Sequence, residues 1–256
     1  MRVPLPPAFV TLPLAHRGYH DASRGRPENG LAAFRAAIAA GYGIELDVQL
    51  SADGEAMVFH DETLDRMTSE TGLVAGCRAG ELRRIRLDGS DDMIPTLTDA
   101  LALVAGRVPV LIEIKEGLDS MTATSGRLEA ATARALVAYQ GPVAVMSFNP
   151  HCMAEMARIA PLVPRGLTTD PYDPADWHPL AAATCHRLRE IPDYDATLSS
   201  FISHKAADLA RPRVAALKAQ GAVVLCWTIR SPAAAALARK TAHNITFESF
   251  PADLHP

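Results

Sequence analysis

Short apolar runs alternate with alanine-rich stretches along most of the chain. Eight of the runs have the composition and length of buried strands: Leu12–Ala15, Ile44–Val48, Met57–His60, Val110–Lys115, Val143–Ser147, Val163–Leu167, Val223–Thr228 and Asn244–Phe247. Most of the intervening stretches are compatible with helices: Gly30–Ala40, Leu97–Val104, Arg127–Tyr139, Pro150–Ile159, Pro212–Ala219 and Pro232–Lys240. Alternation of this kind predicts βαβ units and a parallel sheet.

The number of strands predicts how this sheet closes. Eight parallel strands in a chain of 256 residues favour an α/β fold of the TIM type, a (β/α)8 barrel that forms a single domain over residues 1–256. A ninth extended stretch, Ala196–Ile202, makes the count ambiguous, so an open doubly wound sheet stays an alternative. Local signals predict that Asn29 caps the first helix and that Gly41 ends it.

Composition and charge narrow the class of partner. The formal net charge is −4, which gives no basic footprint for nucleic acid. No apolar run is long enough to span a bilayer, and the start of the chain lacks the layout of a secretory signal. We therefore expect a cytoplasmic protein without stable membrane insertion. Assembly into a homo-oligomer is compatible with the sequence. The four cysteines are far apart and predict neither zinc nor a disulfide framework.

Charged residues interrupt two of the predicted strands in a regular way. Glu45 and Asp47 alternate with apolar residues, and Glu113 and Lys115 do the same on a later strand. Alternate side chains share one face of a strand, and the apolar face has to meet the helices, so these charges point into the barrel. Buried carboxylates are costly unless they are paired or bind a cation. The three carboxylates therefore predict a site for one hard divalent ion, Mg²⁺ or Ca²⁺.

Further polar residues lie where neighbouring strands end. His16 and Arg17 follow the first predicted strand, and His60 and Asp61 end the third. Each of them alone is more often structural than catalytic. Together they predict an active site, because the active sites of barrels lie at the carboxyl ends of the strands. The other histidines lie outside these positions and are expected mostly at the surface: His20, His151, His178, His186, His204, His243 and His255.

The order of these motifs resembles that of the glycerophosphodiester phosphodiesterases. The similarity rests on Leu14–Gly18, Pro27–Asn29, Glu45–Gln49, Phe59–Asp61, Glu113–Lys115, Ser147-Phe148, Trp227-Thr228 and Ile245–Pro251. It runs through nearly the whole chain, in order and with similar spacing. Gly30, Arg230 and Glu248 stand where this family often has threonine, asparagine and aspartate. These departures are expected towards the rim of the site, where they bear on the choice of substrate more than on the chemistry.

The resemblance implies a metal-dependent hydrolase of glycerophosphodiesters, small molecules that it would convert to glycerol 3-phosphate and an alcohol. It makes Glu45, Asp47 and Glu113 the ligands of the Mg²⁺ or Ca²⁺ ion. It makes His16 and His60 the acid–base pair, and we expect His16 to be the base. The residues expected to contact the substrate or its phosphate are Arg17, Glu28, Lys115, Phe148 and Trp227.

Two segments break the alternation of strands and helices. The link from Val48 to Ala56 is too short for a helix, which by itself favours an antiparallel hairpin. We nevertheless predict parallel strands here, because His60 has to reach the phosphate held at Asp47. Residues 61–95 are expected to be a small insertion near the barrel mouth that helps to define the pocket for the alcohol.

Two other functions stay open. The first is another phosphodiesterase of the same superfamily, a phospholipase C or D that acts on lipid headgroups. Residues 61–95 contain arginines among several acids, without the basic or aromatic ridge expected at a membrane. The second is a non-catalytic phosphate-binding barrel, which would need only the cations and neither the histidines nor the carboxylates.

Overall fold

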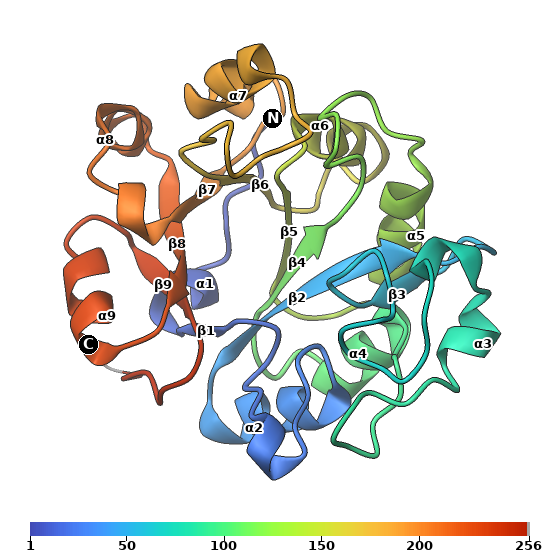
Figure 1. The fold of residues 1–256 in the computed structure, drawn as a ribbon. Helices are drawn as coiled ribbons and strands as arrows, with labels where there is room; N and C mark the ends of the chain where they lie inside the picture. The colour runs from blue at the N-terminus through green and yellow to red at the C-terminus, as the bar shows by residue number, and fades with distance from the viewer. Residues whose placement is uncertain (255–256) are drawn as a thin grey trace.

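Eight parallel strands close into a barrel in the computed structural model, which describes residues 1–254 (Figure 1). In chain order they are β1 (Leu14–Ala15), β2 (Gly43–Leu50), β4 (Val110–Ile114), β5 (Val143–Ser147), β6 (Arg165–Thr169), β7 (Phe201–Lys205), β8 (Val223–Ile229) and β9 (Asn244–Phe247). The ring closes because β1 pairs with both β2 and β9. The predicted TIM-type barrel is therefore confirmed, and the open-sheet alternative is wrong.

One predicted barrel strand does not belong to the ring. The segment predicted at Met57–His60 forms β3 (Ala56–Val58), which pairs with β2 in antiparallel orientation outside the barrel. The eighth barrel strand is instead β7, which begins within the ambiguous stretch Ala196–Ile202. The prediction of parallel β2 and β3 was wrong, because so short a link cannot cross the barrel and return.

Helices lie around the barrel, and most of them cover its outer face (Figure 1). They are α1 (Ala8–Thr11), α2 (Leu31–Ala40), α3 (Ala79–Leu82), α4 (Leu97–Val104), α5 (Arg127–Leu136), α6 (Pro150–Ile159), α7 (Ala182–Arg189), α8 (Pro212–Ala219) and α9 (Pro232–Ala238). Gly41 ends α2 in the left-handed conformation, as predicted. The N-cap of α2 is Gly30, so the capping role predicted for Asn29 was wrong. Across residues 1–254, none of these helices is long and apolar enough to cross a membrane.

The two faces of the barrel strands have different environments. Outward residues such as Ile44, Leu46 and Ile112 pack against the helices in the main apolar cluster. A separate cluster inside the barrel contains Leu111 and Phe201, together with Phe9 from α1. The interior of the barrel therefore has an apolar part, which this cluster fills, and a charged part, which the inward charged side chains of the strands form.

Gly166 on β6 allows Phe201 to fill this interior. A Cβ atom at this position would lie 2.4 Å from ring carbons of Phe201, which is fully buried. We expect Gly166→Ala to lower the free energy of unfolding by about 1–3 kcal/mol, the usual cost of overpacking a core. Urea unfolding measures this change. Gly80→Ala is the control, because its added Cβ would meet no atom within 4 Å apart from its chain neighbours and its own helix backbone. Equal stabilities of the two variants would contradict the packing argument.

Residues 61–95 have a small core of their own. Leu64, Leu82 and Ile94 pack together with Met57 and Phe59 from the β3 region in a second apolar cluster. An isolated antiparallel bridge joins Thr63 to Leu73. The segment is thus a folded insertion beside β3.

Candidate active site

Three buried carboxylates meet inside the barrel, two from the middle of β2 and one from near the end of β4. Glu45 and Asp47 point inward from β2, and Glu113 lies beside Asp47 in the parallel register. They are 1%, 1% and 5% exposed, and one oxygen from each lies within 4.8 Å of the others. The alternation along the two strands therefore predicted their convergence correctly.

Two cations and an amide hold these carboxylates in place. Lys115 Nζ lies 2.6 Å from Glu113 Oε1 and 3.2 Å from Asp47 Oδ1. Arg17 Nε lies 3.5 Å from Asp47 Oδ2. Asn29, held at a positive φ of 57°, donates from Nδ2 to the same oxygen at 2.9 Å. Asn29 is therefore a site residue and not a helix cap.

The charges in this cluster do not balance. Burial, and then repulsion by Asp47 and Glu113, raises the pKa of Glu45 well above its usual range. Burial also opposes the ionisation of Asp47, but Lys115 and other nearby cations outweigh it and lower the pKa. Burial would lower the pKa of Lys115, but Glu113 and Asp47 outweigh it and raise the pKa. Negative charge thus exceeds the cations around Glu45, and three converging carboxylate oxygens fit a hard divalent ion.

The hairpin of β2 and β3 brings His60 to this cluster. β2 continues past Asp47 to Leu50, and β3 returns until the backbone N–H of Phe59 donates to the Asp47 carbonyl at 3.1 Å. His60 therefore follows at the level of Asp47. Its Nδ1 lies 2.6 Å from Asp61 Oδ1. Burial lowers the pKa of His60, only partly offset by the charge of Asp47.

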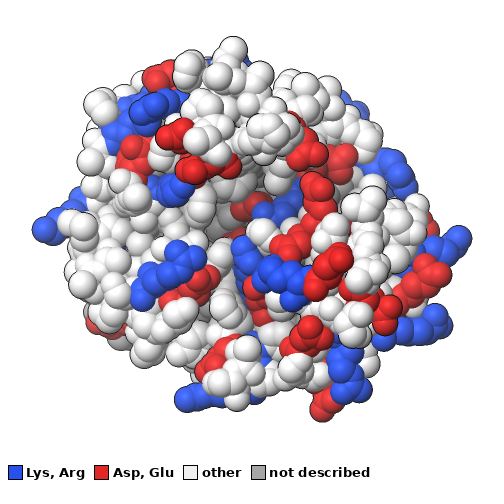
Figure 2. All heavy atoms as spheres, viewed as in Figure 1, with Lys and Arg blue, Asp and Glu red and all other residues white. Residues whose placement is uncertain are grey.

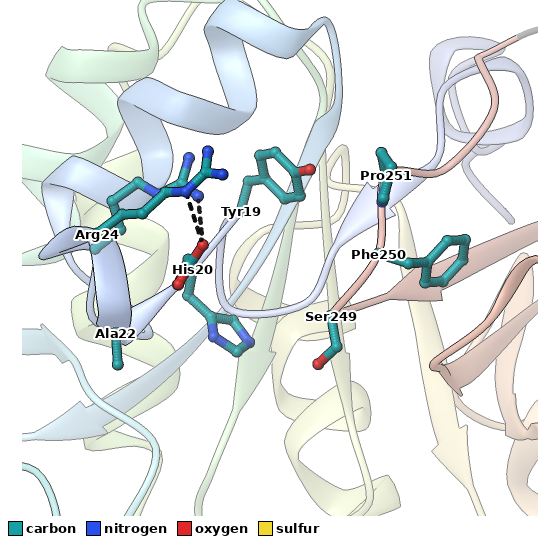
Figure 3. A pocket seen from close by; sticks show the side chains of 9 residues that line it. Tyr19, His20, Ala22, Arg24, Ser249, Phe250 and Pro251 are labelled. Carbon is teal, nitrogen blue, oxygen red and sulfur yellow. Dashed lines mark hydrogen bonds and ion pairs between the residues drawn. The ribbon is translucent and has the colours of Figure 1, made fainter.

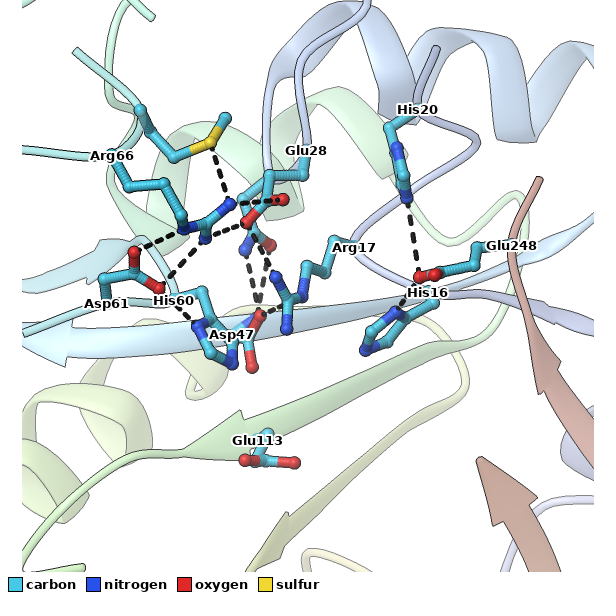
Figure 4. Close-up of polar contacts among 12 residues, drawn as sticks. His16, Arg17, His20, Glu28, Asp47, His60, Asp61, Arg66, Glu113 and Glu248 are labelled. Carbon is cyan, nitrogen blue, oxygen red and sulfur yellow. Dashed lines mark hydrogen bonds and ion pairs between the residues drawn. The ribbon is translucent and has the colours of Figure 1, made fainter. Parts of the chain in front are cut away.

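His16 is oriented by a carboxylate from the last barrel strand. Its Nδ1 lies 2.6 Å from Oε2 of Glu248, which directly follows β9 (Figure 4). Arg230 Nε donates to Glu248 Oε1 at 2.7 Å, and His20 Nε2 lies 3.7 Å from Oε2. The hydrogen bond from His16, followed by the nearby His20 imidazole, lowers the pKa of Glu248. Both active-site histidines thus have Nδ1 bound to a carboxylate, which leaves Nε2 for a substrate.

These groups line one cavity at the barrel mouth. The molecule is hollowed near the centre of this face, with charged side chains around the hollow (Figure 2). The cavity has a volume of about 180 Å³. Its lining residues are His16, Arg17, Glu45, Asp47, His60, Glu113, Lys115, Met146, Phe148, Trp227, Thr228, Arg230 and Thr246. Every predicted site residue except Glu28 is among them, while no residue of 61–95 is.

Aromatic side chains form one wall of the cavity. The rings of Phe148 and Trp227 meet edge to face, with centroids 5.5 Å apart. Trp177 continues this group outward, 5.0 Å from Phe148. Trp227 Nε1 donates to the carbonyl of Ser203 at 2.9 Å, which fixes its ring. The wall suits the apolar part of a bound alcohol or glycerol group.

A second cavity, larger than the first, is lined in part by the residues that follow Glu248. It has a volume of about 480 Å³ and lies between the loop after β1 and the chain after β9 (Figure 3). Tyr19, His20 and Arg26 line one side, and Phe250 lines the other. His20 lines this cavity, and its Nε2 lies 3.7 Å from Oε2 of Glu248, the carboxylate that also contacts His16 of the first cavity.

Some residues around the site were not predicted from the sequence. His20 was expected at the surface but contacts Glu248, and Arg66 contacts Glu28 and Asp61. His204 was also expected at the surface, yet it is fully buried on β7 and bonds to Thr169. His255 lies outside the described residues. Asn29 and Glu248 lie within motifs that carry the family resemblance. Their place in these motifs was the one feature of the sequence that could have identified them as site residues.

A TIM-type barrel that gathers buried carboxylates and two carboxylate-bound histidines in one cavity at its mouth has the arrangement of a candidate hydrolase. The model of the glycerophosphoryl diester phosphodiesterase family matches residues 16–245. The chain belongs to this family, and the resemblance found in the sequence is confirmed. It is accordingly a phosphoric diester hydrolase of the glycerophosphodiester type.

Individual relatives agree with this assignment. A glycerophosphodiester phosphodiesterase from Caldanaerobacter subterraneus is 34% identical over 66% of this chain and 70% of its own. A probable glycerophosphodiester phosphodiesterase 1 from Mycobacterium tuberculosis is 30% identical over 84% of this chain and 81% of its own. Among solved structures, an Oleispira antarctica phosphodiesterase in complex with its product sn-glycerol-3-phosphate has a TM-score of 0.76 and 25% identity. That similarity covers 95% of this chain and 96% of the other.

Proposed function

We propose that the chain hydrolyses glycerophosphodiesters to glycerol 3-phosphate and an alcohol with the help of one divalent cation. The observation that carries this proposal is the buried group Glu45, Asp47 and Glu113, whose oxygens converge within 4.8 Å beside two histidines. The family supplies the substrate class, and the Oleispira relative was solved with glycerol 3-phosphate as its product.

The carboxylates are proposed to hold Mg²⁺ or Ca²⁺. When bound, the cation would supply Lewis-acid chemistry at the phosphate. Arg17 lies next to the cluster and faces the same cavity, so its guanidinium would bind the phosphate and stabilise charge that develops on the oxygens. Lys115 is held by Glu113 and Asp47, so its main contribution is to neutralise the acidic cluster.

The two histidines are proposed to move the protons. His16 would accept the proton of the attacking hydroxyl or water at Nε2, while Glu248 holds Nδ1. His60 would donate a proton to the leaving alkoxide, and Asp61 holds its Nδ1 in the same way. A carboxylate on Nδ1 fixes the ring orientation and stabilises the imidazolium that forms during turnover. Phe148 and Trp227 would contact the carbon skeleton of the substrate.

Chelation provides the direct test of this function. Glycerophosphocholine, glycerophosphoethanolamine and glycerophosphoglycerol are incubated with the protein, and release of glycerol 3-phosphate is measured. We expect turnover of at least one diester, loss of that turnover with EDTA, and recovery with Mg²⁺ or Ca²⁺. Turnover that is unaffected by EDTA would contradict the metal site, and the absence of turnover with every diester and cation would contradict the substrate class.

A further inference from the structure

Arg66, in the inserted segment 61–95, connects two carboxylates that come from different parts of the chain. Its Nε and Nη2 donate to the two oxygens of Asp61 at 2.6 and 2.9 Å. Its Nη1 and Nη2 donate to the two oxygens of Glu28 at 3.0 and 2.6 Å (Figure 4). Paired N–H donors fix the plane of each carboxylate, which a single lysine ammonium cannot do.

Each of these carboxylates holds a group that lines the catalytic cavity. Asp61 Oδ1 lies 2.6 Å from Nδ1 of His60, and Glu28 Oε1 accepts from Nη1 of Arg17 at 2.8 Å. Arg66 itself does not line the cavity. It is therefore one residue removed from both His60 and Arg17, and it joins them through a continuous chain of charged hydrogen bonds.

The insertion presents Arg66 in a fixed way. Leu64, which is 1% exposed, anchors the segment in the second apolar cluster. The backbone N–H groups of Met67 and Thr68 both donate to the Leu64 carbonyl, and this tight turn contains Arg66. The local fold thus places the guanidinium between the two carboxylates.

The charges agree with this geometry. Burial would raise the pKa of Glu28, but Arg66 and Arg17 outweigh it and lower the pKa. Burial also opposes the ionisation of Asp61, but hydrogen bonds from Arg66 and His60 lower its pKa to about 2. The Arg66 side chain is 47% exposed, and pairs so exposed usually contribute little to folding stability. These contacts therefore matter more for the orientation of His60 and Arg17 than for the stability of the fold.

We propose that Arg66 is a positioning residue of the hydrolase: it holds Asp61 against His60 and Glu28 against Arg17, so that the insertion organises both the proton donor and the phosphate-binding cation. The inference rests on the proposed roles of His60 and Arg17. It gives the segment 61–95 a function in the reaction although none of its residues lines the cavity.

Two substitutions test this role by steady-state kinetics on the best glycerophosphodiester. We expect Arg66→Ala to lower kcat/KM by roughly 10–100-fold, the range found when a residue that orients an active-site group is removed. Arg66→Lys keeps the charge but loses the paired donors, so it should recover less than half of this loss on a logarithmic scale. Arg83→Ala is the matched control, because Arg83 lies in the same segment and pairs with Asp99 away from the site. It should retain wild-type kinetics.

A double-mutant cycle separates positioning from a general effect on the fold. In the His60→Ala background, the fold loss of kcat/KM caused by Arg66→Ala should be at least three times smaller than in the wild type, because part of the effect of Arg66 passes through His60. Thermal unfolding midpoints of all variants show whether they are folded. Loss of activity in His60→Ala with unchanged activity in Arg66→Ala would overturn this inference alone, as would fully additive losses. Unchanged activity in His60→Ala would instead contradict the role that the proposed function gives to His60.

Discussion

Replacement of Asp47 by asparagine is expected to abolish tight binding of the divalent cation and to lower turnover by roughly 10³-fold or more. Asp47 is the centre of the acidic cluster, because Lys115, Arg17 and Asn29 all contact it. Asparagine keeps the shape but removes one negative charge and one strong oxygen ligand. The same change leaves the two cations beside a less acidic site, which further disfavours a metal ion.

Calorimetric titration with Mg²⁺ and with Ca²⁺, followed by turnover at saturating metal, measures both effects. Glu129→Gln is a suitable control, because Glu129 is also a fully buried acid but lies on α5 outside the cavity. Burial raises the pKa of Glu129, so the amide replaces a carboxyl group that is already hard to ionise. Wild-type cation affinity in Asp47→Asn would exclude Asp47 as a ligand.

Replacement of either active-site histidine is the other change with a large expected effect. His16→Ala and His60→Ala should each lower kcat by roughly 10²–10⁴-fold, the usual loss when a general acid or base is removed. The double variant should be little slower than the slower single variant, because both groups act in one reaction sequence. His151→Ala is the control, since His151 is exposed on α6.

The choice of leaving group separates the roles of the two histidines. A glycerophosphodiester of p-nitrophenol releases an anion that needs no proton. If His60 is the acid, His60→Ala should lose much less activity with this diester than with glycerophosphocholine, whereas His16→Ala should lose similar activity with both. The reverse pattern would exchange the two roles. Near-normal turnover of both diesters by one single variant would remove that histidine from the mechanism.

The convergence of the three carboxylates was predictable from the sequence because it depends on short-range geometry. Glu45 and Asp47 are two residues apart on one strand, and alternation alone places their side chains on the same face. The apolar residues between them identify which face meets the helices. Glu113 repeats the pattern on β4. The parallel pairing of β2 with β4 then places Glu113 beside Asp47.

The position of His60 shows where reasoning from function misled the prediction of structure. We expected β3 to run parallel to β2 so that His60 could reach the phosphate. The strand is antiparallel, as the short link requires, and His60 still reaches the site because β2 extends beyond Asp47 before the chain turns back. The sequence analysis did not predict how far β2 extends past Asp47. This length depends on the pairing of β2 with β3 in the folded sheet.

By itself, the sequence determined the alternation of strands and helices, the barrel class, and the inward carboxylates, because periodicity and propensity act between residues that are near in the chain. The residues that orient the site could be identified only from the tertiary structure. Glu248 is 232 residues from His16, and Arg66 is 38 residues from Glu28. Such pairs meet only when the ring closes and the insertion packs beside β3, and their geometry depends on the packing of the whole barrel, which no local pattern encodes.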